Sequence, residues 1–163
     1  MHASTSRPLR KSLHTHGVSA SFTDNHFRIQ LIMRDQGDRF SDRRGDMCIP
    51  AHLVPQSRDD VYKSLLDVEY LFDPSYGLLM DRILHHQYDK YQWSLYAFNS
   101  RYYFHAFDAR PTTELKRHHG QSFADTDCKY AAPPSTTLCT WHYQQCVLMY
   151  LRGYSVGMAI NAQ

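Results

Sequence analysis

Several features are scarce in this 163-residue chain, and each absence narrows the classes of protein to which it can belong. It has four cysteines and no Cys-x-x-Cys pair, so neither a zinc ribbon nor the disulfide framework of a small secreted domain is indicated. No apolar run approaches a membrane span, and the basic N-terminal segment lacks the apolar stretch of a secretory signal. We therefore expect an intracellular, reduced protein that does not use a membrane.

The chain also lacks a strong excess of charge of either sign, because its formal net charge is only +2. Up to Arg44, eight Lys or Arg residues and four Asp residues give +4, whereas ten basic and twelve acidic residues in the remainder give −2. The basic excess ends in Arg39, Arg43 and Arg44, a cluster that could hold phosphates. An ordinary solvated loop is the alternative and is the commoner explanation of such a cluster.

The length and the hydrophobic content predict one folded domain. A chain of 163 residues can bury a real core, and twelve Tyr and eight Phe would fill it. Residues 1–22 are rich in Ser, Thr, His and Arg without apolar periodicity, which is typical of a disordered leader. We expect a single domain over residues 23–153 and a tail over residues 154–163.

The middle of the chain predicts a strand, strand, helix unit. Residues 47–54 have the pattern of a strand interrupted by a proline, and residues 78–80 that of a second, buried strand. Asp81 can cap a helix that runs to about Tyr91. Between the two strands, residues 58–70 have helical spacing and lead into a turn.

The flanking segments complete an α+β fold. Residues 27–33 are compatible with a helix or a strand, and we favour a helix. Residues 92–107 alternate as a β-hairpin does, and residues 108–132 are polar and irregular. A last helix should begin after Pro134 and stop near Gly153.

Three side chains suggest a general base and a metal site. His52 ends the first predicted strand, and an imidazole that titrates near neutrality is suited to take a proton from water. His85 and Asp89 lie four residues apart on the predicted helix, so a ring nitrogen and a carboxylate oxygen can converge on one ion. Such mixed ligation permits Mg, Mn, Ni or Zn. The plainer alternatives are a hydrogen-bonded structural histidine and an ordinary surface pair on a helix.

The remaining histidines suggest no such role. His86 would point away from the proposed site, and His118 and His119 lie in a polar stretch where exposure to solvent is the expected state. His142 lies on the last predicted helix beside an aromatic residue, where we expect packing or hydrogen bonding.

The segment AHLVPQS at residues 51–57, followed by DPSYGLLMDRILHHQYDKYQW at residues 73–93, resembles the core of an HNH endonuclease, in the variety common in fungal genomes. The later segments YYFHAFD and LCTWHYQQCVLMYLRG resemble that variety too, so the likeness extends over about residues 27–153. The resemblance implies a ββα-metal finger in which the general base falls on His52 and the metal ligands on His85 and Asp89.

The sequence departs from that family in two places. Its middle Asn, which holds the loop bearing the base, is Tyr76 here, and a phenol cannot replace both the donor and the acceptor of an amide. The Arg34-Asp35 dipeptide is retained, but the turn that often follows it, Cys-x-x-Thr-Gly, is replaced, so we expect a reshaped loop.

Two functions are therefore open. The first is a metal-dependent endonuclease that hydrolyses phosphodiester bonds in DNA, with His52 as the base and His85 and Asp89 holding the divalent ion. The alternative is a degenerate, non-catalytic HNH-like module that binds nucleic acid or a protein partner. Tyr76 favours the second function, whereas the three retained side chains favour the first.

Overall fold

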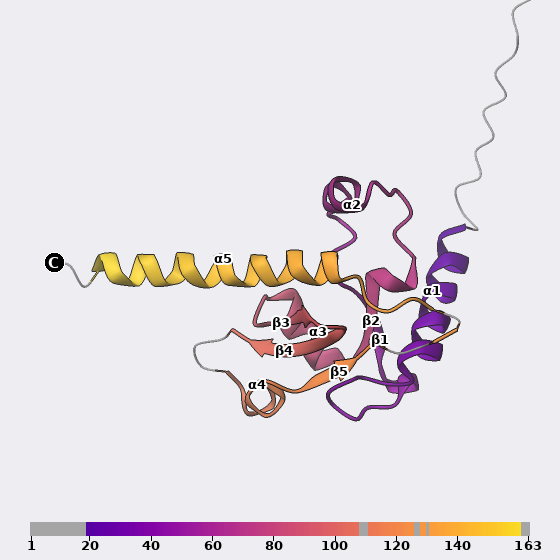
Figure 1. The fold of residues 1–163 in the computed structure, drawn as a ribbon, viewed down its shortest axis with the longest axis horizontal. Helices are drawn as coiled ribbons and strands as arrows, with labels where there is room; N and C mark the ends of the chain where they lie inside the picture. The colour runs from indigo at the N-terminus through magenta and orange to yellow at the C-terminus, as the bar shows by residue number, and fades with distance from the viewer. Residues whose placement is uncertain (1–18, 108–110, 126–127, 130, 161–163) are drawn as a thin grey trace, which may run out of the picture.

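The computed structural model describes residues 19–107, 111–125, 128–129 and 131–160, which form an α+β fold with two small antiparallel sheets (Figure 1). At its centre lies the predicted strand, strand, helix unit. Strand β1 (Ile49–His52) pairs with β2 (Gly77–Met80), so that His52 lies opposite Gly77, and helix α3 (Arg82–Asp89) follows. The sequence-based fold class is confirmed.

Local chemistry explains where α3 begins. The Asp81 side chain accepts a 2.8 Å hydrogen bond from the main-chain nitrogen of Ile83 and so caps the helix, as the sequence predicts. Leu84 and Tyr88, one turn apart, are both buried and anchor α3 to the core. The helix ends at Asp89, two residues earlier than expected, and Tyr91 has a positive φ of 57°.

The long connection between β1 and β2 carries helix α2 (Asp59–Leu66) and a 3₁₀ turn over Pro74–Tyr76. A second 3₁₀ turn, Gly45–Met47, precedes β1. Asp73 caps the Pro74–Tyr76 turn by accepting a 2.9 Å hydrogen bond from the Ser75 main-chain nitrogen. This cap fixes the conformation of the turn and therefore the direction in which the chain enters β2.

The second sheet has the strand order β3-β4-β5, formed by Trp93–Phe98, Arg101–Ala106 and Ser122–Ala124. Asn99 and Ser100 both have positive φ, which is the geometry of a tight hairpin turn and confirms the predicted hairpin.

The expectation of an irregular segment over residues 108–132 is wrong in part. Helix α4 (Thr113–His118) forms there and is capped by the Thr112 hydroxyl, and β5 follows it. Both elements are shorter than the window over which hydrophobic periodicity can be recognised. The expected exposure of His118 is also wrong, because this residue is buried and its Nδ1 lies 3.1 Å from Gln121 Oε1. His119 is exposed, as expected.

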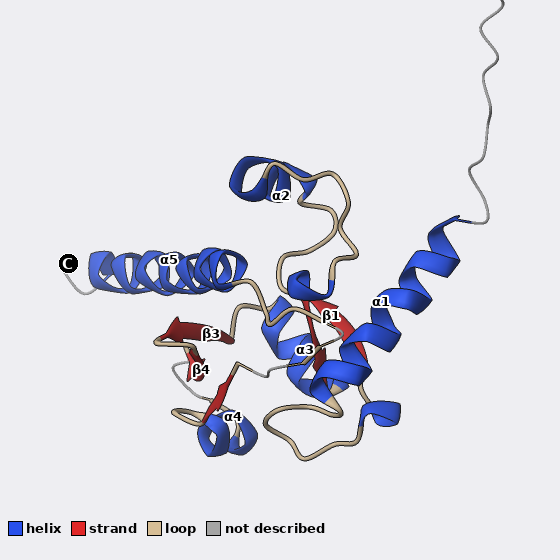
Figure 2. Ribbon diagram, turned by 45° about the vertical axis from the view of Figure 1, so that its right-hand side comes forward, coloured by secondary structure: helices blue, strands red, loops and turns tan. Residues whose placement is uncertain are grey.

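Two long helices flank the sheets (Figure 2). Helix α1 (Ser19–Asp35) confirms and extends the helix predicted over residues 27–33, and it packs against β1 and β2. Helix α5 (Thr136–Ile160) packs against β3 and continues through Gly153, so the predicted stop there is wrong. A glycine inside a helix costs only about 1 kcal/mol relative to alanine, which does not end it by itself. Residues 1–18 of the predicted leader and residues 161–163 lie outside the described part.

Strand β2 is buried on both faces. Leu79 packs in a small hydrophobic cluster with Phe27, Leu31 and Cys48, which lies between α1 and the finger. Leu78 and Met80 point the other way, into the main core. The main core also takes in Trp93, Phe104, Leu138 and Cys139 from the second sheet and α5. Among the described residues, no helix is both long enough and apolar enough to cross a bilayer.

Candidate nuclease site

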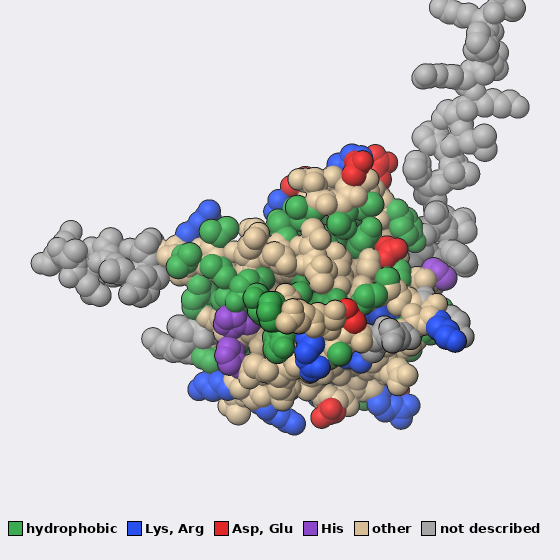
Figure 3. All heavy atoms as spheres, in the orientation of Figure 1, with side chains coloured by type: hydrophobic (Ala, Val, Ile, Leu, Met, Phe, Trp, Pro, Cys, Tyr) green, Lys and Arg blue, Asp and Glu red, His purple; other side chains and the backbone are tan. Residues whose placement is uncertain are grey.

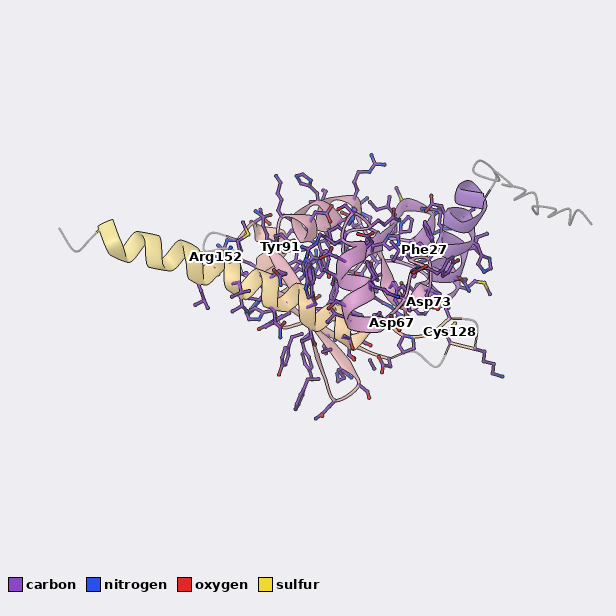
Figure 4. All side chains as sticks on the ribbon, turned by 90° about the horizontal axis from the view of Figure 1, so that it is seen from above. Phe27, Asp67, Asp73, Tyr91, Cys128 and Arg152 are labelled. Carbon is purple, nitrogen blue, oxygen red and sulfur yellow. The ribbon has the colours of Figure 1, made fainter. Side chains whose placement is uncertain are left out.

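His52 lies at the end of β1 and is held between aromatic rings. Its imidazole stacks on Phe27 of α1, with ring centroids 4.6 Å apart, and meets the edge of Phe72 at 5.7 Å. Figure 4 shows Phe27 at the α1 end of the molecule. A side chain at Gly77, the strand partner of His52, would collide with the Phe27 ring. Glycine at this position therefore lets α1 approach His52.

The hydrogen-bond partners of His52 define its tautomer. Nε2 lies 3.0 Å from the main-chain oxygen of Leu71, and a carbonyl oxygen can only accept, so Nε2 carries the proton. Nδ1 is then the nitrogen with a free electron pair. The Gln56 amide nitrogen lies 3.2 Å from Nδ1 and 3.3 Å from Nε2, and it donates to the unprotonated Nδ1. The exposed Gln56 side chain thus fills the hydrogen-bonding position of the basic Nδ1, from which it can be displaced.

Burial favours the neutral form of the His52 imidazole. Burial lowers the pKa of His52 below its ordinary value, and the hydrogen bond to the Leu71 carbonyl and the charge of Asp24 oppose that shift only in part. His85 is near enough that its positive charge would lower the pKa of His52 further. A neutral histidine with one proton fixed on Nε2 is equipped to accept a second proton on Nδ1.

His85 and Asp89 lie one turn apart on α3. The distance from His85 Nε2 to Asp89 Oδ2 is 3.5 Å, and both side chains retain access to solvent. The i, i+4 spacing therefore brings an imidazole nitrogen and a carboxylate oxygen together, as the sequence indicates. Among the described residues, no group of three or more His, Cys, Asp or Glu side chains is arranged to hold an ion. Any ion at this pair would keep most of its coordination shell for water or substrate.

Tyr76 ends the 3₁₀ turn that leads into β2, and its side chain packs against the main core. Its ring tilts against Tyr62 of α2, with centroids 5.5 Å apart, and is partly buried against the main core. Its main-chain oxygen accepts a 2.8 Å hydrogen bond from the nitrogen of Leu53, the residue after His52. Position 76 therefore restrains the loop after His52 through its main chain.

The Arg34-Asp35 dipeptide at the end of α1 positions the finger, a role that the sequence interpretation missed. The two side chains form a buried bidentate ion pair with distances of 2.7 and 2.9 Å. Asp35 Oδ2 also accepts the main-chain N–H of Leu79, and the Arg34 guanidinium donates to the carbonyls of Pro74 and Gly77. One ion pair thus ties α1 to both ends of the turn that leads into β2.

The three arginines of the predicted phosphate cluster have different surroundings. Arg39 lies over the Phe123 ring and 3.6 Å from Asp35, whereas Arg43 pairs with Asp81 at the start of α3. Arg44 is strongly exposed and lies 3.6 Å from the exposed Asp46. On the face drawn in Figure 3, Lys and Arg side chains lie both along the edge and in the lower middle of the face, and they are not gathered into one patch.

Two surface hollows of about 350 and 270 Å³ lie along α5. None of the residues lining them belongs to the His52, His85 and Asp89 set, so neither hollow serves this site. Tyr91 and Arg152, both labelled in Figure 4, line the smaller hollow.

Comparison with known families agrees with this geometry. Residues 31–96 match the family described as HNH endonuclease, a segment that begins within α1 and ends within β3. The matched segment contains the whole ββα unit, so the likeness to the HNH endonuclease family falls on the finger that carries His52, His85 and Asp89. Comparison with curated proteins and with solved structures gave no match.

Proposed function

We propose that this protein is a metal-dependent endonuclease that hydrolyses phosphodiester bonds in DNA. The observation that carries the proposal is the hydrogen bond of His52 Nε2 to the Leu71 carbonyl, which leaves Nδ1 as the basic nitrogen at the end of β1 in an HNH-like finger. The helix of the same finger presents the His85 nitrogen and the Asp89 oxygen 3.5 Å apart. A positive charge on His85 would lower the pKa of His52, so the two imidazoles are near neighbours, which supports placing base and ligands in one site.

His52 supplies the proton acceptor. Its Nδ1 takes a proton from the attacking water once the Gln56 amide has moved aside, while Nε2–H stays bonded to the Leu71 carbonyl. That bond fixes the ring and stabilises the imidazolium that forms. The stacking on Phe27 limits the remaining rotation of the ring.

His85 and Asp89 would hold the divalent ion. One imidazole nitrogen and one carboxylate oxygen fit Mg, Mn, Ni or Zn, and the exposure of both side chains leaves room for water and phosphate oxygens. A bound ion supplies positive charge against the growing charge on the phosphate and on the departing oxygen. Arg43 and Arg44 would contribute phosphate contacts next to the start of α3.

The second candidate is a non-catalytic HNH-like module that binds nucleic acid or a protein partner. The specific observation in its favour is Tyr76, whose side chain packs against Tyr62 where the family has a polar amide. This candidate shares the fold and differs only in lacking turnover.

A plasmid-nicking assay with Mg, Mn, Ni or Zn added singly tests the two candidates. We expect cleavage with at least one ion, none with chelator, and a loss of about 10²- to 10⁴-fold in His52→Ala. His86→Ala is the matched control, because His86 is exposed on the same helix and should leave the rate unchanged. DNA binding without nicking under all four ions would establish the non-catalytic module instead.

A further inference from the structure

The loop that follows His52 is held by two buried tyrosine hydroxyls from different helices. Tyr88 of α3 donates a 3.0 Å hydrogen bond to the main-chain oxygen of Leu53, and Tyr62 of α2 donates a 2.7 Å bond to that of Val54. Both tyrosines are at most 1% exposed. The two main-chain carbonyls that follow His52, those of Leu53 and Val54, are therefore each held by a tyrosine from a different helix.

A third bond completes the restraint on this loop. The Leu53 nitrogen donates to the Tyr76 oxygen, so both main-chain polar groups of Leu53 are paired. Buried polar groups that lose their partner carry the full cost of desolvation, which keeps these bonds formed. Burial also raises the pKa of both tyrosines, so their hydroxyls remain protonated donors.

We propose that Tyr62 and Tyr88 are positioning residues for His52. Their hydroxyls supply the side-chain restraint on the base-bearing loop that Tyr76, with its ring turned to Tyr62, does not supply. The proposal deepens the nuclease function stated above and rests on it for its catalytic consequence. The restraint on the loop itself rests on the hydrogen bonds alone.

Tyr88 also couples the base to the metal ligands. It directly precedes Asp89 on α3, and its hydroxyl reaches the residue that directly follows His52. A short path of covalent bonds and one hydrogen bond therefore joins α3, which carries the proposed metal ligands, to the residue after His52. This path sets the distance between the ligands and the base. Proton transfer depends steeply on such placement, and an error of about 1 Å can cost about 10²-fold in rate.

The test compares Tyr88→Phe and Tyr62→Phe, which remove only the hydroxyls, with Tyr102→Phe as the matched control. Tyr102 is equally buried and also donates to a main-chain carbonyl, that of Pro134, but it lies in the second sheet. The primary measurement is amide hydrogen exchange of Leu53 relative to Leu79, whose N–H is bonded to Asp35. The second is kcat and KM for metal-dependent nicking.

We expect Leu53 exchange to rise by about tenfold relative to Leu79 in Tyr88→Phe and Tyr62→Phe, and to stay unchanged in Tyr102→Phe. We expect kcat to fall by about tenfold or more in the double variant with little change in KM. An unchanged exchange ratio in both single variants would overturn the restraint, whatever the cleavage data show. Faster exchange with unaltered kcat would overturn the positioning role.

The proposed function can fail separately. If the wild-type protein does not cleave under any of the four ions, the nuclease proposal fails. Faster Leu53 exchange in the two variants would then still support the restraint that the tyrosines place on the loop.

Discussion

The imidazole of His142 lies flat on the ring of Tyr88, with centroids 3.6 Å apart and planes inclined by 6°. His142 belongs to α5 and Tyr88 to α3. The last helix therefore packs against the tyrosine whose hydroxyl holds the loop after His52. His142 Nδ1 also lies 2.8 Å from the Ser94 hydroxyl of β3. As expected from the sequence, His142 is a packing and hydrogen-bonding residue.

Stability should fall in mild acid because of His142. Burial lowers its pKa to about 3, whereas the unfolded chain would bind a proton near pH 6.5. Its contribution is therefore complete above about pH 6.5 and is lost as the pH falls toward 3. We expect the free energy of unfolding to be about 2 to 3 kcal/mol lower at about pH 4.5 than at pH 7 from this group. Urea titrations at both pH values measure the difference.

The double substitution His142→Phe, Ser94→Ala serves as the control for that prediction, since it removes the titrating ring and its hydrogen-bond partner together. The pH dependence should become shallower but not vanish, because burial lowers the pKa of His52 as well. An unaltered slope would show that His142 is not the source.

Divalent ions should raise the melting temperature of the wild-type protein and not that of Asp89→Asn. An ion that binds only the folded state stabilises it by mass action, by about 2.7 kcal/mol at a hundred times its Kd. Differential scanning calorimetry with each ion makes the measurement. His86→Ala should behave as the wild type does, and equal shifts in Asp89→Asn would reduce the His85 and Asp89 pair to a surface contact.

Loss of one partner of the Arg34 and Asp35 ion pair should be costly. Asp35→Asn leaves a buried guanidinium without its counter-charge, and we expect a loss of about 3 to 5 kcal/mol in the free energy of unfolding. Asp60→Asn breaks the exposed Arg58 and Asp60 pair, which is almost as close at 2.8 Å, and should change stability very little. Similar losses for both variants in urea denaturation would contradict the importance of burial.

Arg43→Ala, Arg44→Ala should weaken DNA binding through its salt dependence. Each phosphate contact contributes about 0.9 to the slope of log K against log salt, so we expect the slope to fall by up to about 2. Fluorescence anisotropy with a short duplex over a range of salt concentrations measures it. Arg39→Ala should instead lower stability and leave the slope intact, because its guanidinium lies on Phe123 and near Asp35. The reverse pattern would reassign the phosphate contacts.

The parts of the fold that depend on local signals could be predicted from the sequence. The Asp81 cap and the alternation around Asn99 and Ser100 each act within a few residues, and both elements form where expected. Helix α4 has only two buried residues, Leu115 and His118, and a cap, which is too little pattern to recognise.

The candidate site, like the fold, could be predicted from the sequence only in part. Spacing and resemblance single out His52, His85 and Asp89, but the partners of His52 come from Leu71 and from Phe27, which no local pattern connects with it. In the sequence, Arg34 and Asp35 stand out only as a dipeptide that the resemblance retains, with no role attached to it. Only tertiary structure shows them buried.

The Arg34 guanidinium also bears on the order in which the chain folds. It donates to the carbonyls of Pro74 and Gly77, 40 and 43 residues away, and to that of Ala132, 98 residues away. During synthesis, α1 and the finger are complete long before the last of these acceptors leaves the ribosome. Such distant contacts delay folding because the intervening loop must close first. We therefore expect a nascent chain that ends before Ala132 to be a substrate for chaperones, with its arginine still only partly satisfied.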